Sequence, residues 1–309
     1  MCPGPHDRFA RQSLFATALL LAAATPVRAQ LLAYESFNYG TGSSFAVGSS
    51  TPATGTGFTG NLFWDFGTST ASIIQSGSLS YTDSGSNALI TANNFYENGH
   101  GRLAATFDLS GGGPFASYLE SGRIGANGTT IYLSFLYRNT TASTAGFSAF
   151  EVFRGGNTDN ERVLSLNTWS GQAVANYHLT ASNGATFGGG AASAANANLG
   201  FVNSTTNFFV IRFDFGSGGT DTATIYANPL LTAEPGSPTG QVTFGDLSFD
   251  RIVSGTFSGG PPIYLDEIRV GTTYLSVTAI PEPSTVGLIA GAAALGLLMI
   301  RRRILAARR

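Results

Sequence analysis

The chain has 309 residues, of which 40 are glycine and only 11% are charged. Its sixteen basic residues are all arginine and lie largely at the two ends, so residues 31–280 hold eight arginines against sixteen acidic residues, a net charge of −8. An acidic body argues against nucleic acid as a partner, the glycine content disfavours a helical protein, and the 12% aromatic content excludes a disordered chain.

The N-terminus has the parts of a secretory signal peptide. Two arginines precede the apolar run at residues 13–24 (SLFATALLLAAA), and the small side chain of Ala29 suits the position before a cleavage site. We predict a signal helix over residues 1–29, removed by cleavage between Ala29 and Gln30; the alternative is an uncleaved N-terminal anchor. The single cysteine, Cys2, would leave with the signal, which excludes disulfides and cysteine-based metal sites in the mature chain.

Between residues 30 and 280, short runs of alternating apolar and polar residues recur between glycine-rich turns. In residues 130–138 (TIYLSFLYR), every second residue from position 131 to 137 is apolar. Alternation with period two in many short runs is typical of an antiparallel two-sheet β-sandwich. Helix is expected in the body only at residues 115–121 and 191–199. The remaining predicted strands are residues 146–154, 162–167, 174–180, 207–215, 221–227, 247–253 and 263–270.

Beyond the body, a proline motif precedes an apolar segment. The segment, residues 284–300 (STVGLIAGAAALGLLMI), contains seventeen uncharged residues. As a helix it would extend about 25 Å, enough to cross the hydrocarbon core of a bilayer, so we predict a transmembrane helix here. The motif before it consists of Pro281, Glu282 and Pro283, and its prolines prevent the helix from extending backwards.

Three arginines follow the apolar segment at once: Arg301, Arg302 and Arg303. By the positive-inside rule they keep the C-terminal end in the cytoplasm and the body on the other side of the membrane. The order of proline motif, apolar span and arginine cluster over residues 281–303 resembles the PEP-CTERM sorting signal of Gram-negative bacteria. The alternative is an ordinary single-span anchor.

The resemblance implies a partner enzyme and a destination. The tail, residues 281–309, would be recognised by an exosortase, a membrane transpeptidase, with Pro281, Glu282 and Pro283 as recognition residues and not catalytic ones. The protein would first be anchored in the inner membrane with its body, residues 30–280, outside the cytoplasm. After processing near the motif it would reach the cell surface or the extracellular polysaccharide matrix.

The body carries a second resemblance in three short segments. Residues 33–39 (AYESFNY), 221–229 (DTATIYANP) and 265–277 (LDEIRVGTTYLSV) resemble the opening and closing parts of exported PEP-CTERM proteins. The bodies of those proteins are similar to concanavalin-like lectin and glucanase or laminin-G jelly rolls, which implies a two-sheet jelly roll here. The glucanases of this fold carry their acidic residues in a Glu-x-Asp-x-Glu pattern on one strand, and this sequence lacks that pattern.

The acidic residues of the body offer no catalytic arrangement. Asp246 and Asp250 have the spacing of one strand face but no glutamate partner. Asp266 and Glu267 are adjacent in a predicted strand, so they are expected on opposite faces. We therefore predict a non-enzymatic protein without catalytic residues. A diverged glycoside hydrolase is the alternative from another class, and it would require two carboxylates about 5 Å apart in a cleft.

Metal ligands are few. The two histidines of the body, His100 and His178, form no HxH or HExxH motif, so neither a histidine metal site nor a cofactor is expected. Calcium is the one ion with candidate ligands, because Asn157, Asp159 and Glu161 alternate oxygen-bearing side chains as calcium loops do. An ordinary hairpin loop is the alternative for this segment.

Aromatic and amide side chains leave room for a binding function. Trp64 with Asp65, Trp169, and residues 96–98 (Tyr-Glu-Asn) combine rings with carboxylate and amide acceptors, as sugar-binding sites do. Because the chain has 36 aromatic residues, a core position is favoured for any one of these rings. The sequence thus predicts an exported, non-enzymatic surface or matrix protein, associated with exopolysaccharide or biofilm. A lectin-like carbohydrate-binding module is the alternative.

Overall fold

The structure is a computed structural model. The predicted signal segment before Ala29, the proline motif, the predicted membrane span and the arginine cluster lie outside the residues it describes. Within those residues, no helix is long and apolar enough to cross a membrane. The described residues are 29–42, 50–52, 55–59, 61–66, 72–99, 101–142, 146–156, 159–169, 176–181, 195–257 and 259–278.

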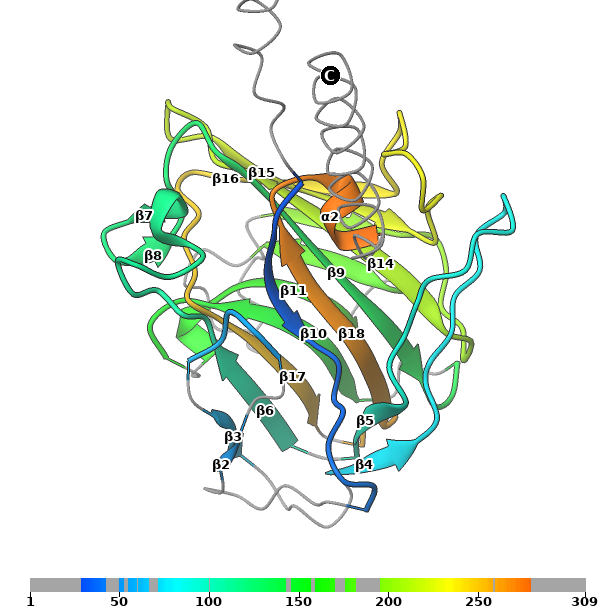
Figure 1. The fold of residues 1–309 in the computed structure, drawn as a ribbon. Helices are drawn as coiled ribbons and strands as arrows, with labels where there is room; N and C mark the ends of the chain where they lie inside the picture. Colours follow the sequence, from blue (N-terminus) through cyan, green and yellow to red (C-terminus); the bar gives the residue numbers. More distant parts are fainter. Residues whose placement is uncertain are drawn as a thin grey trace, which may run out of the picture.

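The described body is a sandwich of two antiparallel sheets of eight strands each (Figure 1), which confirms the fold class predicted from the sequence. Sheet A contains, in spatial order, β16 (Gly240–Phe244), β15 (Asp221–Ala227), β14 (Asn207–Asp214), β9 (Thr130–Asn139), β18 (Ile263–Gly271), β5 (Asn94–Asn98) and β4 (Ser72–Ser76), with β1 (Leu31–Glu35) also paired to β18. Sheet B contains β13 (Ala195–Asn198), β12 (His178–Ala181), β11 (Arg162–Trp169), β10 (Phe147–Phe153), β17 (Arg251–Phe257), β6 (Gly101–Thr106), β3 (Asn61–Phe66) and β2 (Ser50–Pro52). The short elements are the ribbon of β7 (Leu119–Glu120) and β8 (Arg123–Ile124), the 3-10 turns η2 (Ala116–Tyr118) and η3 (Asp159–Glu161), and helix α2 (Tyr274–Thr278).

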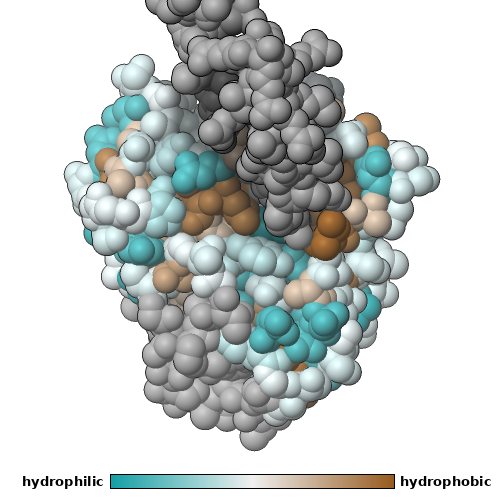
Figure 2. Space-filling model, viewed as in Figure 1, coloured by the Kyte–Doolittle hydropathy of each residue, from teal (hydrophilic) through white to brown (hydrophobic). Residues whose placement is uncertain are grey.

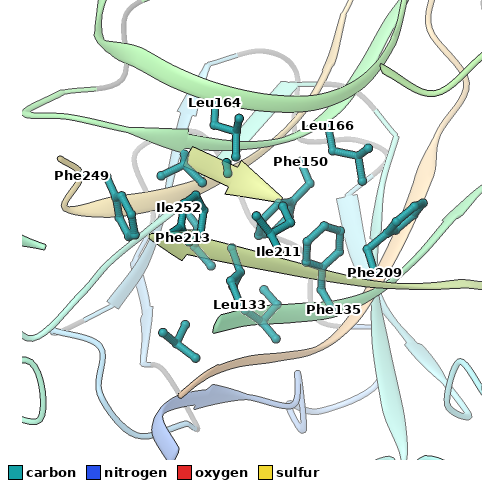
Figure 3. Close-up of a cluster of buried hydrophobic side chains, with 14 of the residues drawn as sticks. Leu133, Phe135, Phe150, Leu164, Leu166, Phe209, Ile211, Phe213, Phe249 and Ile252 are labelled. Carbon is teal, nitrogen blue, oxygen red and sulfur yellow. The ribbon is translucent and has the colours of Figure 1, made fainter. Parts of the chain in front are cut away.

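Alternating side chains of the central strands form the main core between the sheets. The apolar face of β9 and β14 packs against that of β10 and β11 (Figure 3). Phe135 of β9 stacks on Phe150 of β10 with ring centroids 3.9 Å apart, and both rings are buried. The alternation that predicted the strands therefore also predicted which of their side chains fill the core.

Sheet A is buried on its outer face as well. There Tyr132, Leu136 and Val210 belong to a second hydrophobic cluster, which three overlying segments complete. These segments are residues 77–93, residues 228–239 and α2, and together they are called the cover layer below. The cover layer contributes Leu79, Leu89, Leu231, Tyr274 and Val277 to the cluster.

Both helices expected in the body are wrong as full helices. Residues 195–198 form strand β13 and pair with β12, where helix was expected from 191 to 199. Of the helix expected at 115–121 only the three-residue turn η2 forms, because residues 119–120 pair with β8. In both places a backbone ladder outweighs a weak local preference for helix.

The two ends of the described fold lie side by side. Gln30 donates its backbone N–H to Thr272 Oγ1 (3.1 Å), and its carbonyl accepts the N–H of Thr272 (3.0 Å). From there β1 continues antiparallel along β18. At the other end α2 follows β18 closely and closes the described fold at Thr278.

Replacing Phe135 by alanine is expected to lower the free energy of unfolding by about 3–5 kcal/mol, because it removes a buried ring and leaves a cavity against Phe150. Urea-induced unfolding of residues 30–280, followed by circular dichroism, measures the change. Asn127→Ala, in an exposed turn, is the control and should change the free energy by no more than about 0.5 kcal/mol. Equal effects of the two substitutions would show that Phe135 does not anchor the contact between the sheets.

Candidate functional site

The outer face of sheet B carries an ion pair beside an apolar strand. Phe150 and Val152 of β10 point into the main core, so Glu151 between them lies on the outer face, where it is buried. Its carboxylate accepts a hydrogen bond from Nε of Arg162, which is also buried, at the start of β11. Removing both charges from water costs several kcal/mol for each, which makes such a pair a weak contributor to stability and a candidate for function.

Aromatic rings and a second arginine surround this pair. The Arg162 guanidinium lies over the rings of Phe147 and Phe153, 5.4 and 5.5 Å from their centroids. The Arg102 guanidinium, from β6, lies 5.3 Å from the Phe153 centroid. Cation–π attraction favours these placements. The face therefore combines cationic groups, a carboxylate and apolar rings within a few strands.

Two acceptors on this face have no hydrogen-bond donor among the described residues. They are Glu151 Oε2 and Asn167 Oδ1, and both side chains are fully buried. Glu151 pairs with Ser165 across β10 and β11, and Asn167 lies two residues further along β11, so the two acceptors occupy neighbouring strands. The amide nitrogen of Asn167 donates to Thr180 Oγ1 (3.2 Å). A buried acceptor without a donor costs about 1–3 kcal/mol, so this face suits a donor from outside these side chains, such as a hydroxyl group or water.

The sugar-binding candidates chosen from the sequence do not form this face. Tyr96 and Asn98 of β5 are fully buried inside the sandwich, and Tyr96 belongs to the main core, which is the favoured interpretation of its ring from the sequence. Glu97 points the other way and accepts a hydrogen bond from Gln75 (2.5 Å). The one sequence signal for the observed face is a single acidic residue in an otherwise uncharged strand, FSAFEVF. The side chains of Trp64, Asp65 and Trp169 lie outside the described residues.

The calcium candidates are described only in part. Asn157 and the side chain of Asp159 lie outside the described residues, whereas Glu161 is half-buried at the end of η3. Its carboxylate packs against Gly156, where an added Cβ would lie 2.2 Å from Oε2. Among the side chains that the structure describes, no three His, Cys, Asp or Glu residues come together to hold a metal ion. Calcium binding by these three residues stays a prediction.

Asp246 and Asp250 do not act as a pair. The strand expected at residues 247–253 begins only at Arg251, so the spacing of one strand face does not apply to them. Asp246 is exposed in a turn. Asp250 accepts the backbone N–H of Gly155 (2.9 Å) and pairs with Arg251 (2.7 Å).

Asp266 and Glu267 face the same side, and the expectation of opposite faces is wrong. A β-bulge interrupts the pairing of β18 with β9 between Asp266 and Arg269, and Glu267 adopts the left-handed φ of 53°. The Asp266 carboxylate consequently accepts the N–H of Leu79 (3.1 Å), and the Glu267 carboxylate accepts the N–H of Ala92 (2.5 Å). Both donors belong to the cover layer, so the bulge fastens that layer to sheet A.

An arginine and a tyrosine complete the cluster at the bulge. Arg269 donates to Glu267 (2.7 Å) and to the carbonyl of Ile90 (2.6 Å), and the Tyr34 hydroxyl donates to the same Glu267 oxygen (2.9 Å). Burial, followed by the neighbouring Glu267 carboxylate, raises the pKa of Asp266 to about 9. Asp266 is therefore protonated at neutral pH, which makes it a structural group of the cover layer.

A third ionisable cluster is partly exposed where the cover layer meets β14 and β15. Glu234 accepts hydrogen bonds from the hydroxyls of Tyr132 (2.8 Å) and Tyr226 (2.7 Å) and from Arg212 (3.2 Å), which also pairs with Asp214 (2.9 Å). Burial alone would raise the pKa of Glu234, but these hydrogen bonds outweigh it, and the pKa lies below its ordinary value. The carboxylate is thus charged and already engaged.

No protein-family model and no curated protein matches the chain. Several solved structures show a distant likeness. The T. cruzi calreticulin globular domain has a TM-score of 0.40 and 11% identity over 88% of this chain and 100% of that chain. The VIP36 exoplasmic/lumenal domain in its Ca2+/Man-bound form has a TM-score of 0.39 and 9% identity over 60% of this chain and 80% of that chain, and the endo-β-1,4-glucuronan lyase of the fungus Trichoderma reesei has a TM-score of 0.36 and 11% identity over 69% of this chain and 93% of that chain. Likenesses this distant assign no function to the chain.

Asp266→Asn is expected to change how stability depends on pH. The folded-state pKa of Asp266 is raised from 3.8 to about 9, so the wild type loses free energy of unfolding as the pH rises between these values. Asparagine stays neutral, so the variant should lose less between about pH 6 and about pH 9. Urea unfolding at both pH values measures this, with Glu97→Gln, elsewhere on sheet A, as the control. Parallel pH dependence of wild type and Asp266→Asn would contradict a protonated Asp266.

Proposed function

We propose that the protein is an exported, non-enzymatic surface or matrix protein whose tail is processed by an exosortase-type transpeptidase. The observation that carries this proposal is the position of the fold between the two predicted processing sites. The described fold starts with Gln30 beside Thr272 and ends at Thr278. Cleavage after Ala29 or near residues 281–283 would therefore remove no strand of the sandwich.

The engagement of the described carboxylates supports a non-enzymatic role. Glycoside hydrolysis needs two carboxylates about 5 Å apart that reach the substrate. Asp266 and Glu267 come together, but both are buried and both accept backbone N–H groups of the cover layer. Asp214 and Glu234 share Arg212 as their cationic partner. These carboxylates therefore serve the fold.

In the native host, the mature protein is expected to begin at Gln30 and to end before the apolar span, because the tail serves delivery alone. Intact-mass measurement of protein from the cell surface or matrix tests both ends. Changing Pro281 and Pro283 together to alanine should leave uncut protein in the inner membrane. Pro238→Ala, at an exposed proline of the body, should be processed as wild type. Wild-type protein that keeps Arg309 would identify the tail as a plain anchor.

We also propose carbohydrate binding at the outer face of sheet B as an alternative role of the same body. Glu151 Oε2 and Asn167 Oδ1 are buried acceptors that lack a donor among the described residues, and a sugar hydroxyl admitted to this face would supply one. The buried rings of Phe147 and Phe153 lie against the guanidinium of Arg162, the ion partner of Glu151, and add apolar groups to the same face. This combination of acceptors and rings is the observation that favours a polysaccharide over an apolar ligand.

Binding of the native host's exopolysaccharide to residues 30–280 should fall roughly tenfold or more in Glu151→Gln, because a hydrogen bond to a charged acceptor contributes about 1.5–3 kcal/mol. Glu97→Gln, on sheet A, is the matched control and should bind as wild type. Circular dichroism confirms that both variants are folded. If wild type binds no polysaccharide, or if both variants bind alike, the outer face of sheet B is not a sugar site.

A further inference from the structure

The three segments of the cover layer are joined to one another by hydrogen bonds. Tyr274 of α2 donates its hydroxyl to the carbonyl of Leu230 in residues 228–239 (2.5 Å). The N–H of Leu231 in the same segment donates to the carboxylate of Asp83 in residues 77–93 (2.8 Å). The cover layer is therefore one unit, and the side chains on its free side keep a fixed arrangement.

The free side of the cover layer exposes large hydrophobic side chains. Ile90, Leu230 and Leu275 are 55%, 42% and 48% exposed, and among the described residues no other large hydrophobic side chain is exposed. Each comes from a different segment of the cover layer, and these three residues are called the hydrophobic patch below. Figure 2, viewed as in Figure 1, shows separate areas of brown hydrophobic surface among white and teal ones on the described part of this side of the molecule. Single exposed apolar side chains are normal in soluble proteins, but here all three large ones among the described residues come from one layer, which marks that layer as a candidate interaction surface.

The residues of the hydrophobic patch are linked to the helix at which the described fold ends or to the sheet beneath it. Leu275 lies within α2, and Leu230 is bonded to that helix through its carbonyl. Ile90 is fixed to sheet A, because its carbonyl accepts a hydrogen bond from Arg269 of β18. Ser134, the strand partner of Arg269, donates its hydroxyl to the last turn of α2 (2.8 Å).

The length of the chain beyond α2 ties this patch to the predicted membrane span. Five residues, 279–283, separate the end of α2 from the uncharged segment at residues 284–300. Even when fully extended, five residues reach only about 18 Å. A span inserted in a bilayer would therefore hold α2, and with it Leu275 of the patch, within about that distance of the membrane surface.

We propose that the cover layer rests on the lipid bilayer while the tail is inserted, with the hydrophobic patch in the boundary between headgroups and acyl chains. This inference rests on the proposed insertion of the tail, and it names the surface that the body turns towards the membrane. Moving apolar side chains from water into this boundary lowers the free energy of the system. Charge opposes the contact little, because the Asp83 carboxylate is buried and the partly exposed Glu234 carboxylate is paired with Arg212. Three side chains are too few for stable binding without the span.

Single-cysteine labelling tests the contact. The chain from Gln30 to Arg309 has no cysteine of its own, so Leu230→Cys and Leu275→Cys each provide one site for an environment-sensitive fluorophore. In phosphatidylcholine vesicles, both labels should shift their emission to shorter wavelength and be quenched by nitroxide-labelled lipids. The control is Gly111→Cys, beyond β6 of sheet B, where an added Cβ meets no atom within 4 Å. Its label should remain in water.

Flotation of the same samples with the vesicles separates the contact from the insertion of the tail. Chains that fail to float would refute the insertion on which the inference rests. Chains that float while the labels at positions 230 and 275 remain in water would refute the contact and leave the tail unaffected. A shift of both labels without vesicles would show that a second copy of the chain covers the patch, which would also overturn the proposal.

Discussion

The sandwich depends on β18, the strand that completes sheet A. It pairs with β9 along one edge and with β5 and β1 along the other, and it is buried along nearly its whole length. It is also the last strand of the described chain. The edges of β1 and β5 that pair with β18 therefore stay unpaired during synthesis until almost the whole body has been made. Pairing between such distant segments makes folding wait for the complete body. If the tail is removed as proposed, this constraint requires the cleavage to lie after β18.

The bulge in β18 makes the same strand the attachment point of the cover layer. The left-handed backbone of Glu267 is strained, and strain of this kind costs about 1–3 kcal/mol. The burial of the Asp266 and Glu267 carboxyl groups is also unfavourable by itself. Hydrogen bonds from Leu79 and Ala92 and the ion pair with Arg269 offset that cost. The strained residue orients the carboxyl groups of Asp266 and Glu267 towards the layer, and sheet A gains a second hydrophobic cluster beneath it.

The sequence predicted the features that depend on local periodicity and missed those that depend on distant partners. The inward residues of β9 and β14 follow from period two, because each side chain alternates whatever the strand pairs with. The bulge at Glu267 breaks the alternation of period two at one residue, and nothing in the neighbouring sequence predicts it. Strand β13 (Ala-Asn-Ala-Asn) has little strand preference, so only its pairing with β12 makes it a strand. The burial of Glu151 likewise depends on its neighbours in space, and from the sequence it is an ordinary acidic residue.

The two proposed surfaces lie on opposite sides of the sandwich, because one covers the outer face of sheet A and the other is the outer face of sheet B. A body that rests on a bilayer through its cover layer directs Glu151 and Asn167 away from the membrane. That is the side on which an extracellular polysaccharide would be met. The relative direction of the two faces is fixed, since the cover layer is hydrogen-bonded to sheet A and sheet A packs on sheet B through the main core. Release from the membrane would therefore free the hydrophobic patch without altering the polar face, so the two proposed roles can follow each other in one molecule.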